Sequence, residues 1–233
     1  MGVFISIYIK RCLRPFVKEI AVSRVKFGYA NMANKGACSI RFKYKDSSLA
    51  FASSHLDSGI GPGLDTNRRQ QLETIIKNSF IYERGTNMLQ YNWQSHDIKV
   101  IFGDLNFRNT VNLDMDQAMK LISQDDIQTL QGYDEWVQFS KQPKNKKGIL
   151  RNYREGCITF GPTYKYIVKT DQYDTNRMPA YTDRILFESV HDLPQKNPLM
   201  NIYYGKIDYN LSDHKPVTGL FEAKIKVVNA AMK

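Results

Sequence analysis

The sequence predicts an α/β fold, because strand patterns and helix patterns alternate along it. Residues 98–104, IKVIFGD, have the alternation of a mostly buried strand that ends at Gly103. Residues 67–81 carry apolar positions at helical spacing, and a second such run follows Asp114. Open α/β folds place their functional sites at strand ends, so the residues that follow Gly103 are the first candidates.

The composition indicates a single domain over residues 1–233. A chain of 233 residues that is 42% hydrophobic buries one large core, and nothing in it indicates a second. The longest apolar stretch near the start, residues 3–9, is too short to span a bilayer, and no signal-peptide pattern precedes it. The three cysteines are widely spaced and indicate neither a disulfide framework nor a zinc site. We therefore expect a soluble, intracellular protein.

The charge favours an anionic partner. Lys and Arg number 33 against 23 Asp and Glu, for a net charge of +10, which fits phosphorylated ligands, an acidic membrane face or nucleic acid. Residues 141–154 hold six basic residues and no acidic one. A solvated surface loop is the simpler interpretation of this stretch, and attraction to anionic lipid or nucleic acid is the alternative.

The first third of the chain predicts a series of strands. Residues 3–10 alternate as a strand almost from the first methionine, which hints that upstream elements are absent; an ordinary N-terminal strand is the alternative. Further strands are expected at residues 20–27, 37–44 and 49–54. The turn NMANKG between two of them presents Lys35 in a loop.

The rest of the chain predicts two helices and two further strands. On the helix at residues 67–81, Arg68 and Arg69 are expected on the solvated face, and Asp114 opens the second helix as part of a capping box. Strands are expected within residues 179–187 and from residue 217 to 227. The neighbouring residues Asp183 and Arg184 favour a structural salt bridge.

Polar side chains collect at the ends of these strands. A carboxylate and an amide two residues apart can orient a nucleophilic water, although an Asp/Asn turn is the alternative interpretation. A carboxylate beside a histidine favours the charged imidazole, which can stabilise a developing phosphoryl charge. No GxSxG or CxxxxxR motif is present, so direct attack by water is favoured over a covalent route. The six candidates are His55, Asp104, Asn106, Asp183, Asp213 and His214.

Five motifs, in this order, resemble those of the inositol polyphosphate 5-phosphatases over nearly the whole chain. They are SSHLDSG, FGDLNFR, PTYKY, PAYTDRIL and SDHKPV. PAYTDRIL is similar to the hallmark P-A/S-W-x-D-R-I-L of that family, with Tyr181 where tryptophan is usual, and NKGACSIRF is similar to its GNKGxxxIRF strand. The resemblance implies a four-layered α/β sandwich of the DNase I type, in which two packed, mostly antiparallel sheets are flanked by helices.

The resemblance also implies an activity and a set of roles. The activity is Mg²⁺-dependent removal of the 5-phosphate from phosphoinositide lipids or soluble inositol phosphates, by a cytoplasmic protein that is peripheral on cytosolic membrane faces. Asp104 would activate the attacking water and Asn106 would orient it. His214, paired with Asp213, would contact the scissile phosphate, and His55 would stabilise the transition state. Asp183 and Arg184 would organise the site, and Arg184 would also contact the substrate.

Two groups of residues match the substrate-binding segments of the family. Tyr164, Lys165 and Arg177 resemble the group that holds the 4-phosphate, and Asn34 and Lys35 resemble the loop that meets the 1-phosphate near the membrane. Lys and Arg suit this work because they bind phosphate by charge-assisted hydrogen bonds. Nucleic acid is not expected as a partner, and the oligomeric state is left open.

The chain departs from the family pattern at two places. The early strand that carries an asparagine, and the Q-E motif whose glutamate ligates Mg²⁺, have no counterpart here, so the metal ligands are unknown. A fragment of a longer domain is the favoured interpretation, and a partner that supplies the missing part or a degenerate, inactive domain are the alternatives. Thr175 stands where a second cation is common, which predicts a reduced preference for 4-phosphorylated substrates. The rival functions are a phosphoinositide-binding module without turnover and a nuclease of the same superfamily.

Overall fold

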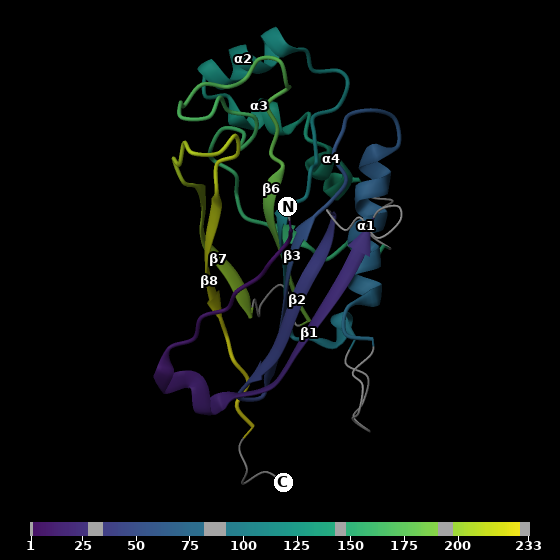
Figure 1. Ribbon diagram of the computed structural model, residues 1–233, viewed down its shortest axis with the longest axis vertical. Coiled ribbons are helices and arrows are strands. Elements are labelled where there is room, and N and C mark those ends of the chain that lie inside the picture. Colours follow the sequence, from purple (N-terminus) through teal and green to yellow (C-terminus); the bar gives the residue numbers. More distant parts are fainter. Residues whose placement is uncertain (1, 28–34, 82–91, 143–147, 191–197, 229–233) are drawn as a thin grey trace.

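Two β-sheets and one long helix form the framework of the protein (Figure 1). The computed structural model describes residues 2–27, 35–81, 92–142, 148–190 and 198–228. The larger sheet has six strands in the order β1-β2-β3-β4-β6-β5, and β7 and β8 pair in a second sheet. The strands are β1 (Val17–Phe27), β2 (Lys35–Tyr44), β3 (Ser47–His55), β4 (Ile98–Asp104), β5 (Arg154–Glu155), β6 (Asp183–Ser189), β7 (Leu199–Lys206) and β8 (Val217–Ala223).

The larger sheet is mixed. β3 and β4 run parallel, whereas the other neighbouring strands are antiparallel. Parallel strands need a crossover connection. The connection from β3 to β4 contains α1 (Leu64–Asn78) and the 3₁₀ helix η3 (Trp93–Ser95). The predicted α/β fold with two packed sheets and flanking helices is therefore confirmed, with one parallel pair in a mostly antiparallel framework.

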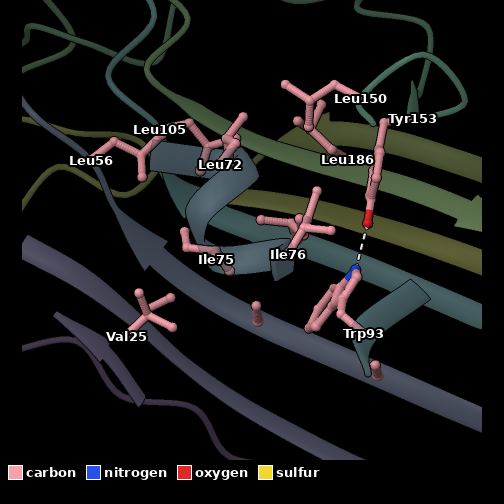
Figure 2. Packing of buried hydrophobic residues seen from close by; sticks show 14 of the residues in the cluster. Val25, Leu56, Leu72, Ile75, Ile76, Trp93, Leu105, Leu150, Tyr153 and Leu186 are labelled. Atoms are coloured by element: carbon pink, nitrogen blue, oxygen red, sulfur yellow. Dashed lines mark hydrogen bonds between the residues drawn. The ribbon is translucent and has the colours of Figure 1, made fainter. Parts of the chain in front are cut away.

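The helix α1 covers one face of the larger sheet, and a core forms between them (Figures 1 and 2). Leu72, Ile75 and Ile76 point from α1 toward the sheet and are at most 1% exposed. Alanines 50 and 52 of β3 lie beneath the helix with no exposed surface, so small side chains let the helix approach the strands closely. Burial of this apolar face accounts for most of the stability of α1.

A hydrogen bond between Trp93 and Tyr153 lies within this core (Figure 2). The indole Nε1 of Trp93 donates a hydrogen bond of 2.6 Å to the hydroxyl of Tyr153. Both rings are buried, so each polar atom finds its partner in the other. The contact joins the crossover connection to the segment that leads into β5.

The opposite face of the larger sheet packs against the small sheet. Phe187 of β6 and Phe221 of β8 meet edge to face with their ring centroids 5.0 Å apart. Val100 of β4 and Leu199 of β7 belong to the same apolar cluster. These contacts hold β7 and β8 across the sheet from α1, while α2 (Met115–Ser123), α3 (Ile127–Gln131) and α4 (Glu135–Lys141) lie at the end of the sheet where β4 finishes (Figure 1).

The N-terminal prediction was wrong in one respect. Residues 2–10 are extended and their burial alternates, but they form no strand; the 3₁₀ helix η1 (Arg11–Phe16) follows them. Val3 is half-buried while Phe4 is 79% exposed, so the alternating sequence pattern matches a segment that is covered on one side. A strand also needs the backbone of a neighbour to pair with, and the polar contact seen here is the Cys38 thiol on the carbonyl of Val3.

Other predicted elements shift at their ends or differ in burial. The predicted helix at residues 67–81 spans residues 64–78, and the last predicted strand ends at Ala223 rather than at residue 227. Arg68 was expected in solvent but is fully buried, because its guanidinium pairs with Glu135 at 2.6 Å and donates to two backbone carbonyls. Asp114 caps α2 as predicted, accepting from the backbone of Gln117. The middle of the predicted basic loop, residues 143–147, lies outside the described residues.

Among the described residues, no helix combines the length and the apolar character that a bilayer crossing requires.

Gly103 sets the contact between β3 and β4, and its replacement tests the fold. Its φ is +125°, and a Cβ there would lie 2.3 Å from the carbonyl oxygen of Ser54. We expect Gly103→Ala to prevent native pairing of β3 with β4 and to leave little folded protein. Gly63→Ala is the matched control, because its φ of +81° is also positive but the space around it is open; it should cost about 1 kcal/mol.

Circular dichroism and urea unfolding of both variants measure the two effects. Similar stability of Gly103→Ala and Gly63→Ala would contradict the close approach at Ser54.

Candidate active site

Three strand ends bring the first site residues into one row. His55 of β3 pairs in register with Asp104 of β4, and Asp104 pairs with Asp183 of β6. His214 lies just before β8 and reaches the same row. The side chains of these four residues keep between 20% and 27% of their surface exposed, so solvent reaches them all.

Asp104 is an ionised carboxylate in contact with cationic groups. Its Oδ2 lies 3.2 Å from Nε2 of His55, and its Oδ1 accepts a hydrogen bond from the backbone of Asn106. Burial acts to raise the pKa of Asp104, but the hydrogen bond from His55 and the charges of His214, His55 and Lys35 outweigh it, so the pKa lies below its usual value. The carboxylate is therefore available to accept a proton or a hydrogen bond from water.

His214 is paired with Asp183 and not with its neighbour Asp213. Its Nδ1 lies 2.9 Å from Oδ2 of Asp183. Asp213 instead makes a backbone hydrogen bond, in which its carbonyl accepts from the N–H of Tyr166. The predicted pairing with Asp213 was wrong, because the fold places the carboxylate of Asp183, remote along the chain, at Nδ1 of His214. Burial acts to lower the pKa of His214, but the hydrogen bond and charge of Asp183 outweigh it and raise the pKa.

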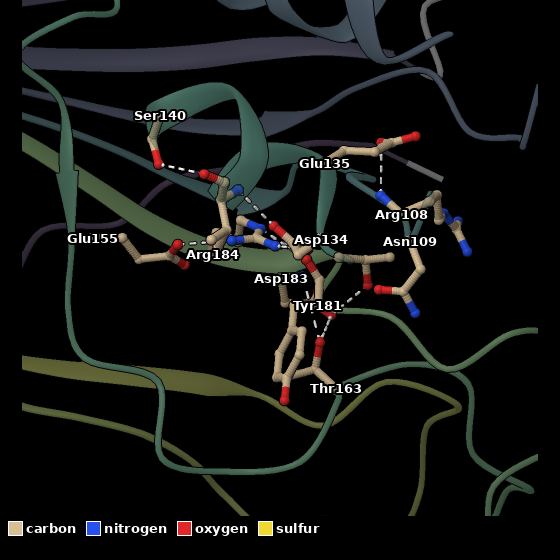
Figure 3. A network of polar contacts seen from close by, with 12 residues as sticks. Arg108, Asn109, Asp134, Glu135, Ser140, Glu155, Thr163, Tyr181, Asp183 and Arg184 are labelled. Atoms are coloured by element: carbon tan, nitrogen blue, oxygen red, sulfur yellow. Dashed lines mark hydrogen bonds and ion pairs between the residues drawn. The ribbon is translucent and has the colours of Figure 1, made fainter. Parts of the chain in front are cut away.

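Asp183 is held by three donors. Its Oδ2 accepts from the hydroxyls of Thr163 at 2.8 Å and Thr182 at 2.9 Å, in addition to His214 (Figure 3). Both threonines are fully buried. These three hydrogen bonds fix the direction of the carboxylate, so Asp183 orients His214 and leaves Nε2 as the ring nitrogen that can meet a substrate.

Lys35 reaches the same cluster from β2. Its Nζ lies 2.5 Å from Nε2 of His55, the nitrogen that also faces Asp104. One ring nitrogen cannot accept from Lys35 and donate to Asp104 at the same time, so the tautomer of His55 decides which of the two contacts is a hydrogen bond. Burial, the largest influence, lowers the pKa of Lys35. Its predicted neighbour Asn34 lies outside the described residues.

Asn106 forms part of the wall of the site. It is 1% exposed and has a φ of +55°. Its Nδ2 donates to the carbonyl of Leu56 at 2.9 Å, and its Oδ1 accepts from the guanidinium of Arg108. The carboxamide is therefore fixed on both sides. Arg108 was not among the predicted residues, although it closes the FGDLNFR motif that contains both Asp104 and Asn106.

Arg184 does not meet the expectations for it. Its guanidinium is fully buried and pairs with Asp134 and with Glu155, the latter at 2.7 Å, rather than with Asp183 (Figure 3). Its Nε donates to the carbonyl of Tyr181 at 2.8 Å. All these contacts lie inside the protein, so the prediction that Arg184 contacts a substrate is wrong. Arg184 instead stabilises the position of β6 from the interior. Neither acidic partner could be identified from the sequence, since both are remote along the chain.

The residues predicted to hold a 4-phosphate lie on one loop. Lys165 pairs with Asp174, with Nζ and Oδ2 3.0 Å apart, and the exposed Arg177 bonds through its backbone to the carbonyl of Asp174. The ring of Tyr164 contacts that of His214 at a tilt, with the ring centroids 4.6 Å apart. The loop therefore connects to the central cluster through Tyr164, and the charge of Lys165 is partly compensated.

The described side chains do not make up a metal site by themselves. No group of three or more His, Cys, Asp and Glu residues in the part of the chain that the structure describes is arranged to hold a metal ion. Oδ2 of Asp183 and Oδ1 of Asp104 accept hydrogen bonds, and Oδ2 of Asp104 faces His55. A hard divalent cation needs several oxygen ligands, so this donor set does not fit Mg²⁺ unaided.

A cavity in the described part of the chain lies outside the cluster. Its volume is about 520 Å³, and its walls include Ile60, Arg69, Asn109 and Phe139. None of the four clustered residues of the first row lines it. The chemistry points to the cluster, because carboxylates and imidazoles converge there and can move protons, whereas no histidine is among the residues that line the cavity.

Comparison with known proteins identifies the family. The profile of Endonuclease/Exonuclease/phosphatase family 2 matches residues 1–220. The chain belongs to this family. A probable inositol polyphosphate 5-phosphatase of Schizosaccharomyces pombe is 32% identical over 245 residues, which are 99% of this chain and 20% of the relative. Human synaptojanin-1 is 32% identical over 256 residues, 99% of this chain and 15% of the relative. The chain thus spans a fifth or less of the length of these relatives.

A solved structure agrees with this assignment. The inositol polyphosphate 5-phosphatase domain of SPsynaptojanin, in complex with inositol (1,4)-bisphosphate and calcium ion, is 31% identical with a TM-score of 0.73. The match covers 92% of this chain and 58% of that chain. The resemblance inferred from the motifs is therefore confirmed, as is the DNase I-like fold.

The His214 and Asp183 pair predicts a pH dependence of stability. A histidine whose folded pKa is raised stabilises the fold fully below its unfolded value of about 6.5, and this contribution is lost as pH rises through the folded pKa. In Asp183→Asn we expect the pKa of His214 to fall and this part of the pH dependence to disappear. NMR titration of the ring and urea unfolding between about pH 6 and 9 measure both effects.

Asp213→Asn is the control for this prediction. It should change the pKa of His214 less, because Asp213 acts on the ring only through its charge. A larger effect of Asp213→Asn than of Asp183→Asn would show that the pairing seen here is wrong.

Proposed function

We propose that this chain carries the catalytic domain of a phosphatase that removes the 5-phosphate from inositol polyphosphates or phosphoinositides. The arrangement that carries the proposal is the row of His55, Asp104 and Asp183 with His214 bonded to Asp183. Support comes from the relatives named as 5-phosphatases and from the related domain solved with an inositol bisphosphate. Because the chain spans only a small part of its relatives, the activity is proposed for the domain alone.

In this proposal, water attacks the phosphorus directly. Ionised Asp104 accepts a proton from the water, and His214, held protonated by Asp183, donates a hydrogen bond through Nε2 to a phosphoryl oxygen. Lys35 adds positive charge near Asp104, and the His55 ring contacts both groups. Each of these groups stabilises charge that grows in the transition state, so none needs to become covalently modified.

Magnesium is part of the proposal as a cofactor. The related domain was solved with calcium, which supports a divalent cation in this family. The donor set described above does not hold such an ion unaided, so no step of the mechanism is assigned to it here. We propose cytoplasmic action at anionic membrane faces, in line with the net charge of +10.

A binding module without turnover is the second candidate. The incomplete metal donor set favours it, since the cationic groups alone suffice to bind a phosphate. A nuclease is less well supported, because two relatives at 32% identity are named as 5-phosphatases of inositol phosphates. In this proposal the loop with Tyr164, Lys165 and Arg177 adds phosphate contacts beyond the central cluster.

Replacement of Asp104 separates the two candidates. Asp104→Asn keeps the size of the side chain but removes the base, so phosphate release from phosphatidylinositol 4,5-bisphosphate should fall at least about 100-fold. Binding of the lipid should persist, because one negative charge near Lys35 is lost. Asp116→Asn, an exposed change on α2, is the control.

Phosphate release by the unchanged chain, with Mg²⁺ and with a chelator, completes the test. If the folded protein binds the lipid but releases no phosphate under either condition, the phosphatase proposal is wrong and the binding module is the better interpretation.

Lys165 should set the preference for a 4-phosphate. In Lys165→Gln, the kcat/KM ratio between substrates with and without this phosphate should fall about tenfold, the value of one charge-assisted hydrogen bond. Lys169→Gln, an exposed change on the same loop, should leave the ratio unaltered. Equal ratios in the two variants would place the 4-phosphate elsewhere.

A further inference from the structure

Arg108 has a buried charge that the proposed mechanism does not use. It is 7% exposed, and its backbone N–H donates to the carboxylate of Glu135 at 2.8 Å. Its guanidinium donates to Oδ1 of Asn106 and lies 4.5 Å from the centre of the Tyr164 ring. In the described part of the chain, no carboxylate pairs with this guanidinium and no acceptor meets its Nε. A buried cation with so few partners is costly, which argues for a role beyond stability.

We propose that Arg108 is a positioning residue. It holds the side chains of Asn106 and Tyr164 in place, and through Tyr164 it connects the end of β4 to the segment that carries His214. The proposal rests on the proposed function, because the groups it positions are those of the phosphatase site. Nothing in the relatives' names or in the motifs assigns this role.

The first part of the role is the direction of the Asn106 carboxamide. A guanidinium only donates, so it fixes the amide oxygen toward Arg108 and the amide nitrogen toward the carbonyl of Leu56. A flipped carboxamide would set donor against donor and acceptor against acceptor. With a φ of +55° the backbone of Asn106 also sits in a sparsely populated region, so the side-chain contacts help to hold it there.

The second part is the position of Tyr164. Its ring contacts both Arg108, at 4.5 Å from the guanidinium carbon to the ring centre, and the His214 ring, at 4.6 Å between centroids. A planar guanidinium can stack on an aromatic ring and hydrogen-bond in its own plane at the same time, whereas a lysine ammonium cannot. Arg108 therefore couples the residues on both sides of the phosphate position.

The kinetic test compares Arg108→Lys with Arg69→Lys. Arg69 is a matched control, because it also stacks on a ring, that of Phe139 at 4.8 Å, but lies outside the cluster and pairs with Asp65. For phosphate release from phosphatidylinositol 4,5-bisphosphate, Arg108→Lys should lower kcat about 100-fold with little change in KM, the effect of a misplaced catalytic group. Added guanidinium should restore part of the activity of Arg108→Ala. A kcat equal to that of Arg69→Lys would overturn the proposal.

A second measurement does not depend on turnover. The side-chain amide of Asn106 should give a single, slowly exchanging NMR signal in the unchanged protein, and a shifted, faster-exchanging one in Arg108→Lys, with no such change in Arg69→Lys. An Asn106 signal that stays the same in Arg108→Lys overturns the positioning role. If the unchanged protein binds the lipid but releases no phosphate, the proposed function fails, and this measurement still decides whether Arg108 positions Asn106.

Discussion

The strand register of the larger sheet is the constraint on which the site depends. His55, Asp104 and Asp183 face one another only because β3, β4 and β6 pair in a single register, with each residue at the end of its strand. Side chains alternate along a strand, so a slip of one residue would turn each of them to the other face. The register is held by burial on both faces: α1 covers one, and β7 and β8 cover the other. The apolar cores therefore determine the geometry of the polar site.

Buried ion pairs form a second support behind the row. Asp134 and Glu135 are adjacent at the start of α4, yet they serve different arginines: Asp134 pairs with Arg184 of β6, and Glu135 pairs with Arg68 of α1. Asp134 also caps α4 by accepting from the backbone of Val137. Removing one partner of such a pair leaves a buried charge uncompensated, which costs several kcal/mol. The N-terminus of α4 therefore contacts both α1 and β6 through buried ion pairs behind the site.

The site itself combines opposite charges that are only partly compensated. Asp104 has a lowered pKa and His214 a raised one, because each group lies near charges of the opposite sign. Both shifts favour the ionised form, as a base and a hydrogen-bond donor require. Partial exposure leaves room for a phosphate to take over contacts that the side chains now make with one another.

The sequence by itself determined the strand ends that carry the chemistry and the fold class, because period-two and helical patterns are local and the motifs are continuous. It placed His55, Asp104 and His214 at strand ends, and the structure brings them together. Only the tertiary structure decided the partners. His214 bonds Asp183 rather than adjacent Asp213, Arg184 turns inward, and Arg68 and Arg108 are buried. Hydrogen bonds and ion pairs join residues distant in sequence, so their choice depends on which elements pack together, and no local pattern encodes that.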